Sequence, residues 1–291
     1  MKNILVVLFI FLINFSVSGM EKTKQEEKTG ILLVSFGTSY ANAQSALDHI
    51  EAQVKDAFPG IEVRWAFTSN IIRNILKKRG RLIDSPAEAL AKMGADGFTK
   101  IAVQSLHIIP GEEFENLQKT VNAFNHIPKN TKKIVLGKPL LYHHEDIAET
   151  CNALLNILPP ERQSDEGVVF MGHGTTHSSN IYYPGVQYYL WQHSSLLFLG
   201  TVEGYPGLDE IISALKVNKV KTVWLQPFMS VAGDHAQNDM AGEESDSWKS
   251  ILEAEGFNVK LVLKGLAEFD PINNIWIKHL KELFENQTQF P

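Results

Sequence analysis

The sequence contains a single cysteine, Cys151, among 291 residues. An internal disulfide framework is therefore excluded, and the fold must be stabilised by its apolar core. Basic residues are also in deficit, because 27 Lys and Arg stand against 33 Asp and Glu and give a net charge of −6. Nucleic acids require a basic binding face, so the composition argues against a nucleic-acid partner.

Long apolar runs are absent as well. The longest covers residues 4–13, which is shorter than the roughly 20 residues of a membrane-spanning helix. It follows Lys2 and precedes the small residues Ser18 and Gly19, which is the layout of a secretory signal peptide. We therefore expect residues 1–29 to be a signal peptide and polar leader, with export to the periplasm and no stable membrane insertion after cleavage. An uncleaved anchor is the alternative.

The motifs of several common enzyme classes are missing. The chain has no G-x-S-x-G of a serine hydrolase and no H-E-x-x-H of a zinc protease. Residues 167–177, GVVFMGHGTTH, place a histidine between two glycines. This stretch lacks the third glycine of a dinucleotide fingerprint and the lysine of a phosphate loop. A phosphate site at residues 172–176 stays open as an alternative.

Short apolar runs alternate with helical patterns along the chain, which is typical of strand–helix units around a parallel sheet. The predicted strands are residues 30–35, 61–65, 100–106, 133–136, 167–171, 196–202, 221–226 and 258–263. The predicted helices are residues 41–58, 85–97, 111–124, 146–158, 207–218 and 245–256. The pattern therefore predicts an α/β protein.

The two halves of the chain form a weak internal repeat. ILLVSFGTS from Ile31 matches VVFMGHGTT from Val168 in its pattern. Gln104 and Gln226 are each followed, seven positions later, by a glycine. Nine positions after the glutamine stands Glu113 in the first copy and His235 in the second. The repeat predicts two similar lobes, residues 30–141 and 142–291, each a parallel sheet flanked by helices, with a cleft between them. Chance similarity between βα units is the alternative.

Three candidate metal ligands follow three different predicted strands. His173, Glu203 and His235 each lie at or beyond the carboxyl end of a strand, where ligands collect in parallel sheets. Two imidazoles and one carboxylate suit a divalent transition metal and leave positions open for exchange. Taken singly, each histidine also fits a hydrogen-bonded loop residue, and Glu203 also fits a helix cap.

Other charged or titratable residues carry weaker signals. His177 is interpreted as a bystander, a residue without a role in the site. His107, in the loop before Gly111, stays a candidate for a functional role. Residues 71–81 include five basic side chains, which fit either a solvated helix end or a binding patch for a polyanion.

Six ordered motifs resemble the anaerobic, class II sirohydrochlorin cobaltochelatase family, with the leader of an exported type. They are LLVSFGTSY, RWAFTSNIIRNIL, VQSLHIIPGEEF, VVFMGHGTTH, VEGYPGLD and SVAGDHAQNDMAGEESDSWK, and the resemblance runs from about Ile31 to Leu280. It implies two similar α/β lobes around a tetrapyrrole cleft, and insertion of Co2+, or of Fe2+, into sirohydrochlorin.

The resemblance also implies roles for individual residues. It makes His173 and His235 metal-site histidines, adds Glu203 to them, and places Glu113 in the cleft, with His173, Glu113 and His235 as the catalytic group. The implied substrate-binding residues are Ser35, Phe36, Gly37, Thr38, Ser39 and Gln104. Because sirohydrochlorin carries many carboxylates, residues 73–81 and Arg64 are expected to form a docking surface. The backbone amides of residues 37–39 are the alternative.

The leader departs from the cytoplasmic members of this family. It raises a second hypothesis, in which an envelope protein binds or carries haem, another tetrapyrrole or a metal in the same cleft. Self-association is expected by analogy with exported relatives. His and Glu ligands accept several divalent ions, so the sequence leaves the metal preference open.

Overall fold

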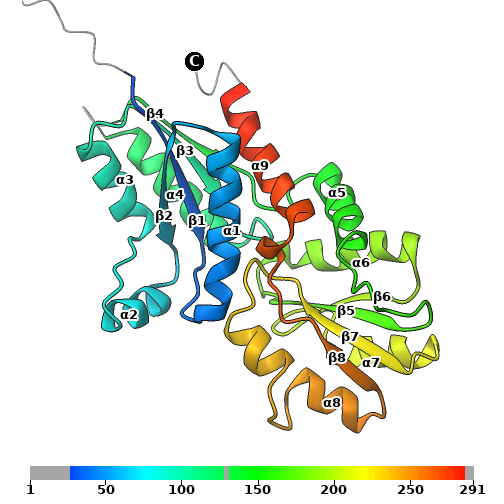
Figure 1. The fold of residues 1–291 in the computed structure, drawn as a ribbon. Coiled ribbons are helices and arrows are strands. Elements are labelled where there is room, and N and C mark those ends of the chain that lie inside the picture. The colour runs from blue at the N-terminus through cyan, green and yellow to red at the C-terminus, as the bar shows by residue number, and fades with distance from the viewer. Residues whose placement is uncertain (1–26, 128–130, 286–291) are drawn as a thin grey trace, which may run out of the picture.

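In the computed structural model, residues 27–127 and 131–285 are described, and they fold into two parallel four-stranded sheets (Figure 1). The strand order is β2-β1-β3-β4 in the first sheet and β6-β5-β7-β8 in the second. The strands are β1 (Thr29–Ser35), β2 (Glu62–Phe67), β3 (Lys100–Ser105), β4 (Lys133–Gly137), β5 (Gly167–Gly172), β6 (Leu197–Thr201), β7 (Thr222–Pro227) and β8 (Asn258–Leu261). The predicted fold class is confirmed.

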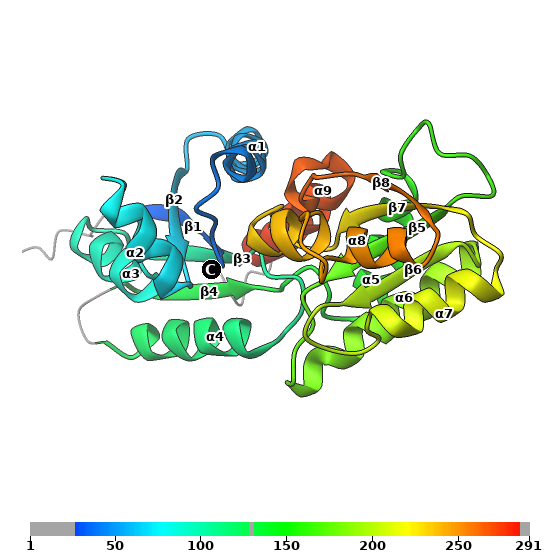
Figure 2. The ribbon, with the colours of Figure 1, turned by 90° about the horizontal axis from the view of Figure 1, so that it is seen from below.

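Helices cover both faces of each sheet (Figure 2). They are α1 (Ala41–Ala57), α2 (Asn70–Lys78), α3 (Pro86–Ala95), α4 (Glu112–Asn125), α5 (His144–Leu155), α6 (Tyr182–His193), α7 (Leu208–Val217), α8 (Trp248–Ala254) and α9 (Asp270–Glu285), with short helical turns η1 (Ser178–Ile181), η2 (Ala236–Met240) and η3 (Leu266–Glu268). The sequence did not predict α6, because Pro184 and Gly185 are loop signals and its aromatic residues mask a helical period.

The internal repeat is present in the backbone. Leu33 pairs with Gln104 in the first sheet, and Phe170 pairs with Gln226 at the same register of the second. Gly37 and Gly174 occupy matching positions and both adopt a left-handed conformation, with φ of 98° and 82°. The two lobes therefore share strand order, register and the turn that follows their central strand.

A continuous apolar core joins the lobes. One cluster of buried side chains includes Ile31 of β1, Phe170 of β5 and Trp276 of α9. Helix α9 packs against β3 and β4 of the first sheet as well as against α5 (Figure 1). The end of the chain thus returns to the first sheet, and the division at residues 141 and 142 stays a prediction about chain segments.

The predicted leader overlaps the fold at its end. Thr29 begins β1, and the backbone N–H of Lys28 donates to Oγ1 of Thr99 over 3.0 Å. The rest of the predicted signal peptide and leader, residues 1–26, lies outside the described residues. Within the described part of the chain, no helix combines the length and the apolar character needed to span a membrane.

Candidate metal centre

Three side chains converge beyond the carboxyl ends of the second sheet. His173 follows β5, Glu203 follows β6 and His235 follows β7, and one ligand atom from each lies within 4.8 Å of the other two. Nδ1 of His173 is 3.8 Å from a carboxylate oxygen of Glu203. The imidazole rings of His173 and His235 have centroids 4.5 Å apart and are nearly perpendicular, at 87°. The structure therefore brings together the three residues that the strand ends predicted.

The His173 and Glu203 loops are in direct backbone contact. The backbone N–H of Glu203 donates to the carbonyl of His173 over 2.7 Å. Gly174 allows this approach, because a Cβ at that position would lie 2.4 Å from the backbone nitrogen of Gly204. Its left-handed φ also favours glycine. Gly174 thus serves close packing between two ligand-bearing loops, whereas Gly172 makes room for the ring of Tyr183.

Each histidine has a hydrogen-bond partner for its Nδ1 atom. Nδ1 of His173 lies 2.8 Å from the carbonyl of Gly174, so this nitrogen is the protonated donor. Nδ1 of His235 lies 2.5 Å from Oδ2 of Asp239, four residues later on the π-helical turn η2. Such partners fix the tautomer and the ring orientation of metal-binding histidines. Nε2 of both rings is therefore the atom offered to an ion.

Asp239 was not among the predicted site residues. Its signal was the i, i+4 spacing from His235 in HAQND, which places the two side chains on one side of a helical turn. The turn is a π-helix, a form that often marks functional sites.

The three candidate ligands are accessible. Their side chains are 43%, 59% and 31% exposed for His173, Glu203 and His235 respectively. Structural metal sites are closed, with four protein ligands, whereas this donor set supplies three and leaves positions open. Imidazole and carboxylate suit divalent ions such as Co2+, Fe2+, Ni2+ and Zn2+. The arrangement is therefore chemically suited to an ion that arrives and leaves.

The first lobe meets the His235 loop through residues 35–40. Ser35 and Thr38 are buried, whereas the ring of Phe36 is 48% exposed. Gly233 approaches Thr38 closely, since a Cβ on Gly233 would lie 3.6 Å from its Oγ1. The hydroxyl of Tyr40 donates to Oδ1 of Asp234, the residue before His235, over 2.6 Å. This hydrogen bond links the predicted substrate segment to the loop of a metal ligand, and no sequence pattern pointed to it.

Two other predicted site residues make no described contact with this group. Glu113 is exposed in the first turn of α4, and none of its described contacts reaches His173, Glu203 or His235. Gln104 is 1% exposed, and its amide donates to the carbonyls of Ser105 and Lys138. A substrate would reach Gln104 only after that face of β3 was uncovered, so its role in substrate binding stays a prediction.

Two further histidines that the sequence singled out, His107 and His177, have partners elsewhere. Nδ1 of His107 lies 2.8 Å from Oγ of Ser105, its Nε2 is buried, and burial lowers the pKa of this imidazole to about 4. Nε2 of His177 lies 3.3 Å from a carboxylate oxygen of Glu115 on α4. His177 thus joins the two lobes, which is more than the bystander role expected from the sequence.

The phosphate alternative at residues 172–176 finds no support in the loop geometry. The backbone N–H of Thr175 donates to Oδ1 of Asn180, and that of His177 donates to Oγ1 of Thr175. Both donors are therefore already engaged, whereas a phosphate loop leaves its N–H groups to the ligand.

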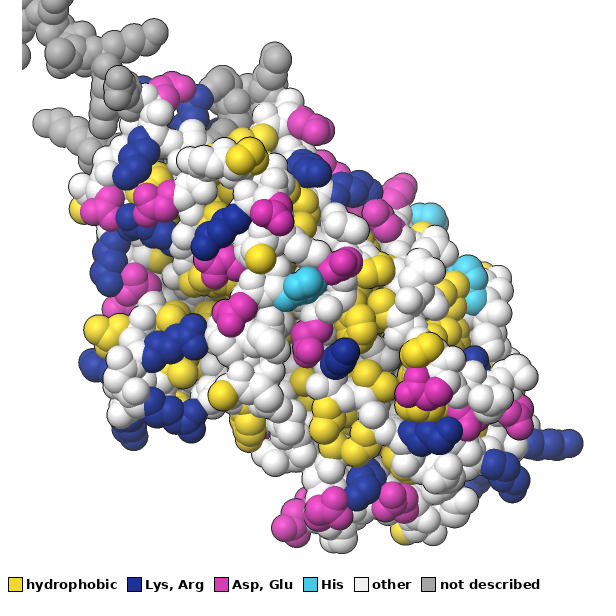
Figure 3. Space-filling model, viewed as in Figure 1, with side chains coloured by type: hydrophobic (Ala, Val, Ile, Leu, Met, Phe, Trp, Pro, Cys, Tyr) yellow, Lys and Arg dark blue, Asp and Glu magenta, His cyan; other side chains and the backbone are white. Residues whose placement is uncertain are grey.

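The residues expected to form a docking surface lie on different elements. Arg64, near the start of β2, forms ion pairs with Glu62 and Asp96, and its part in a docking surface stays a prediction. Lys and Arg side chains gather over α2 (Figure 3), and Arg79 donates to the carbonyl of Ser39 over 2.5 Å. The end of the basic run therefore contacts the predicted substrate segment.

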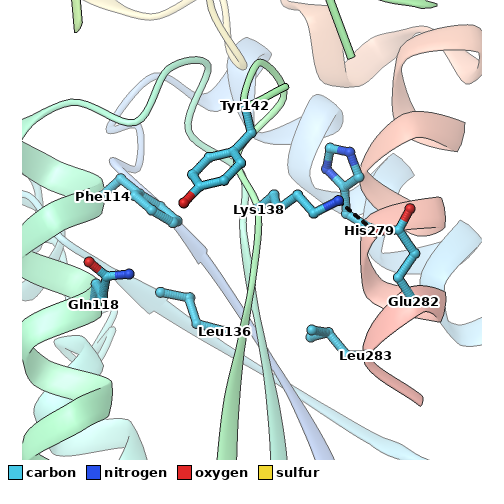
Figure 4. Close-up of a pocket in the computed structure, with 8 residues that line it drawn as sticks. All are labelled: Phe114, Gln118, Leu136, Lys138, Tyr142, His279, Glu282 and Leu283. Carbon is cyan, nitrogen blue, oxygen red and sulfur yellow. Dashed lines mark hydrogen bonds and ion pairs between the residues drawn. The ribbon is translucent and has the colours of Figure 1, made fainter. Parts of the chain in front are cut away.

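A separate hollow of about 320 Å3 lies between α4, β4 and α9 (Figure 4). Its lining includes Tyr142, His279 and an ion pair of 2.8 Å between Lys138 and Glu282. None of the three candidate metal ligands lines it. The hollow is therefore distinct from the metal centre.

Comparisons with solved structures agree with the fold. SirB from Bacillus subtilis with Fe3+ matches with a TM-score of 0.59 at 16% identity, covering 91% of this chain and 100% of that one. CbiX, described as the terminal enzyme of sirohaem biosynthesis in denitrifying bacteria, matches with a TM-score of 0.55 at 13% identity, covering 88% and 99%. At these identities the likeness concerns the fold alone.

Comparisons of the sequence identify the family. The sirohydrochlorin cobaltochelatase CbiKC of Nitratidesulfovibrio vulgaris (strain Hildenborough) is 43% identical over 253 residues, 87% of this chain and 89% of that protein. The sirohydrochlorin cobaltochelatase of Salmonella typhimurium (strain LT2) is 38% identical over 257 residues, 88% and 96% of the two chains. A family model described as cobalt chelatase (CbiK) matches residues 29–285. The family indicated by the sequence motifs is thereby confirmed: the chain belongs to the cobalt chelatase family.

Proposed function

We propose that this protein inserts Co2+ into sirohydrochlorin at the centre formed by His173, Glu203 and His235. The observation that carries the proposal is the convergence of three accessible ligand atoms within 4.8 Å, on three neighbouring strand ends. The activity named for the two relatives, which are about 40% identical to the chain, supports the choice of metal and macrocycle.

The proposed roles follow from the chemistry of metal insertion. Co2+ enters as a substrate, sheds water, and is held by Nε2 of the two histidines and by the Glu203 carboxylate. The macrocycle gives up two pyrrole protons as it takes the ion, so a proton acceptor must lie beside the metal. In our proposal Nε2 of His173 takes up one of these protons after it has passed the ion to the macrocycle, and the other proton leaves to water. Glu113 is the second candidate for the base. The exposed ring of Phe36 gives the macrocycle an apolar face to lie against.

We also propose that the protein acts outside the cytoplasm, on the strength of the signal-peptide pattern in residues 1–29. Cell fractionation with an antibody against the folded chain tests this directly. Recovery in the periplasmic fraction is the expected result, and recovery with cytoplasmic markers would overturn it. Self-association is a further expectation, which light scattering of the purified protein tests.

The chelatase proposal is tested by mixing purified protein, Co2+ and sirohydrochlorin and following the absorbance change of the macrocycle. His173→Ala is expected to lose at least about 100-fold in rate, since general-base catalysis alone contributes that much. His235→Ala is expected to lose most of the rate, because it removes a metal ligand. Unchanged rates in both variants would overturn the centre. Parallel reactions with Fe2+ and Ni2+ establish the metal preference.

A haem titration beside the same assay tests the envelope carrier hypothesis. A Soret shift without cobalt turnover would favour the carrier and count against the chelatase. None of the contacts among the described residues singles out haem as a ligand, so the chelatase is the function we put forward.

A further inference from the structure

Asn180 connects the two loops that carry His173 and Glu203. It lies in the short turn η1, and its side-chain amide bonds to both loops. Oδ1 of Asn180 accepts from the backbone N–H of Thr175 over 3.1 Å, and Nδ2 donates to the carbonyl of Tyr205 over 2.8 Å. Each of these backbone groups lies two residues from a candidate metal ligand.

The loops meet tightly at this point. A Cβ at Gly204 would lie 2.3 Å from Oδ1 of Asn180 and 3.0 Å from Cα of Gly174. Only glycine therefore fits at position 204 while Asn180 keeps its place. The amide lies directly against the seam between the loops.

The two loops are linked on two sides. On one side are backbone bonds, in which the N–H of Val202 donates to the carbonyl of Gly172 over 3.1 Å and the N–H of Glu203 donates to the carbonyl of His173. On the other side Asn180 bonds to both loops. Bonds on one side alone would let the loops pivot about each other, whereas the link through Asn180 restrains the pivot. This restraint matters because the His173 and Glu203 side chains are 43% and 59% exposed, so burial alone does not hold them in place.

We propose that Asn180 is a positioning residue that sets the separation of His173 and Glu203 for the incoming ion. The inference rests on the proposed metal centre and extends it. Asn180 is not itself a ligand, because its amide oxygen and nitrogen are both engaged by backbone groups. It acts through the loops, as outer-sphere residues commonly do around metal ions.

The test is the affinity of the purified protein for Co2+ alone, measured by titration of the visible d–d absorption of the ion. Asn180→Ala is expected to bind Co2+ about 10- to 100-fold more weakly, the usual cost of losing an outer-sphere partner. The band shape should also change, since it reports the ligand geometry.

The first lobe offers a matched control. Asn125, the last residue of α4, makes the same two kinds of bond to Ile134: its Oδ1 accepts from the N–H and its Nδ2 donates to the carbonyl, both over 2.8 Å. Asn125→Ala removes an equivalent pair of bonds far along the chain from the centre. It should lower thermal stability comparably and leave Co2+ affinity unchanged.

A second variant keeps the test usable if Asn180→Ala does not fold. Asn180→Asp keeps an acceptor for the N–H of Thr175 and loses the donor to Tyr205, so its affinity should fall between those of the wild type and Asn180→Ala. Wild-type affinity in folded Asn180→Ala, or in Asn180→Asp if the alanine variant does not fold, would overturn the positioning role alone. Absence of Co2+ binding by the wild type would instead overturn the metal centre.

Discussion

The two lobes share the same backbone fold and differ in the side chains that it presents. In the first lobe the N–H of Ser69 donates to the carbonyl of Phe36, and in the second the N–H of Glu203 donates to the carbonyl of His173. Phe36 and His173 are thus structural counterparts, and so are Ser69 and Glu203. All three candidate metal ligands nevertheless belong to the second lobe.

This difference in side chains shows that the shared fold alone does not make the metal site. The turn after each central strand, with its left-handed glycine, presents the preceding side chain at the carboxyl end of the sheet in both lobes. In one lobe that side chain is an apolar ring, and in the other it is an imidazole. A repeated scaffold can therefore supply a surface for a flat macrocycle from one copy and metal ligands from the other, because chemistry lies in the residues placed on the fold.

Exchanging the counterparts is the strongest way to break this comparison. His173→Phe gives the second lobe the residue of the first, and it should lower the rate of Co2+ insertion at least about 100-fold, because both a ligand and a base are lost. Phe36→Leu, which keeps an apolar side chain, should change the rate far less. The absorbance assay measures both, and equal losses in the two variants would contradict a division of labour between the lobes.

The second pair of counterparts should show a smaller contrast. Glu203→Gln is expected to weaken Co2+ binding about 10-fold or more, since losing even an outer-sphere partner costs that much. Oγ of Ser69 accepts from the N–H of Ile72 and caps α2. Ser69→Ala should therefore cost about 1 kcal/mol of folding free energy and leave the Co2+ affinity intact. Thermal unfolding and Co2+ titration of both variants test the contrast, which weaker metal binding in Ser69→Ala would remove.

The sequence predicted the sheet composition and the metal group for the same reason. Strand periodicity locates the carboxyl ends of strands, and in a parallel sheet those ends lie together. It could not predict Asn180 or Tyr40, because their partners are backbone groups or residues whose position depends on loop packing. Asp239 did leave a local signal, its i, i+4 spacing from His235. Strand periodicity also could not predict the ion pair of Arg64 with Asp96, because the two residues come from different elements. The docking role that the resemblance implies for Arg64 stays a prediction.

The loops after β3 and β7 differ in a titratable residue, which gives the first lobe a pH-dependent stability. The carbonyl of His107 accepts from Leu140, as that of Met229 accepts from Leu266, so the two residues are counterparts. Burial lowers the pKa of His107 to about 4, so the folded protein keeps this imidazole neutral while the unfolded chain takes up a proton below about pH 6.5. The stability that depends on the neutral form is thus complete above pH 6.5 and is lost as the pH falls toward 4.

His107→Met, which installs the residue of the second lobe, should remove this acid sensitivity. Between pH 7 and pH 5 the wild type is expected to lose on the order of 1 kcal/mol more folding free energy than the variant. Urea denaturation at the two pH values measures the difference. As a control, His126→Gln changes a histidine at the C-terminal end of α4. A wild-type pH dependence in His107→Met would rule out His107 as its source.

The smallest expected effect concerns the contact between the lobes. Tyr40→Phe keeps the ring and removes the hydroxyl that donates to Asp234 and accepts from Asn238. Because these bonds are exposed, their loss should cost about 0.5 kcal/mol and weaken Co2+ binding roughly twofold through a less restrained His235 loop. Tyr182→Phe is the matched control, since it removes a hydroxyl that donates to the carbonyl of Tyr142 over 2.8 Å. If Co2+ titration gives the same affinity for both variants, the first lobe has no part in placing His235, and its contribution is confined to the macrocycle.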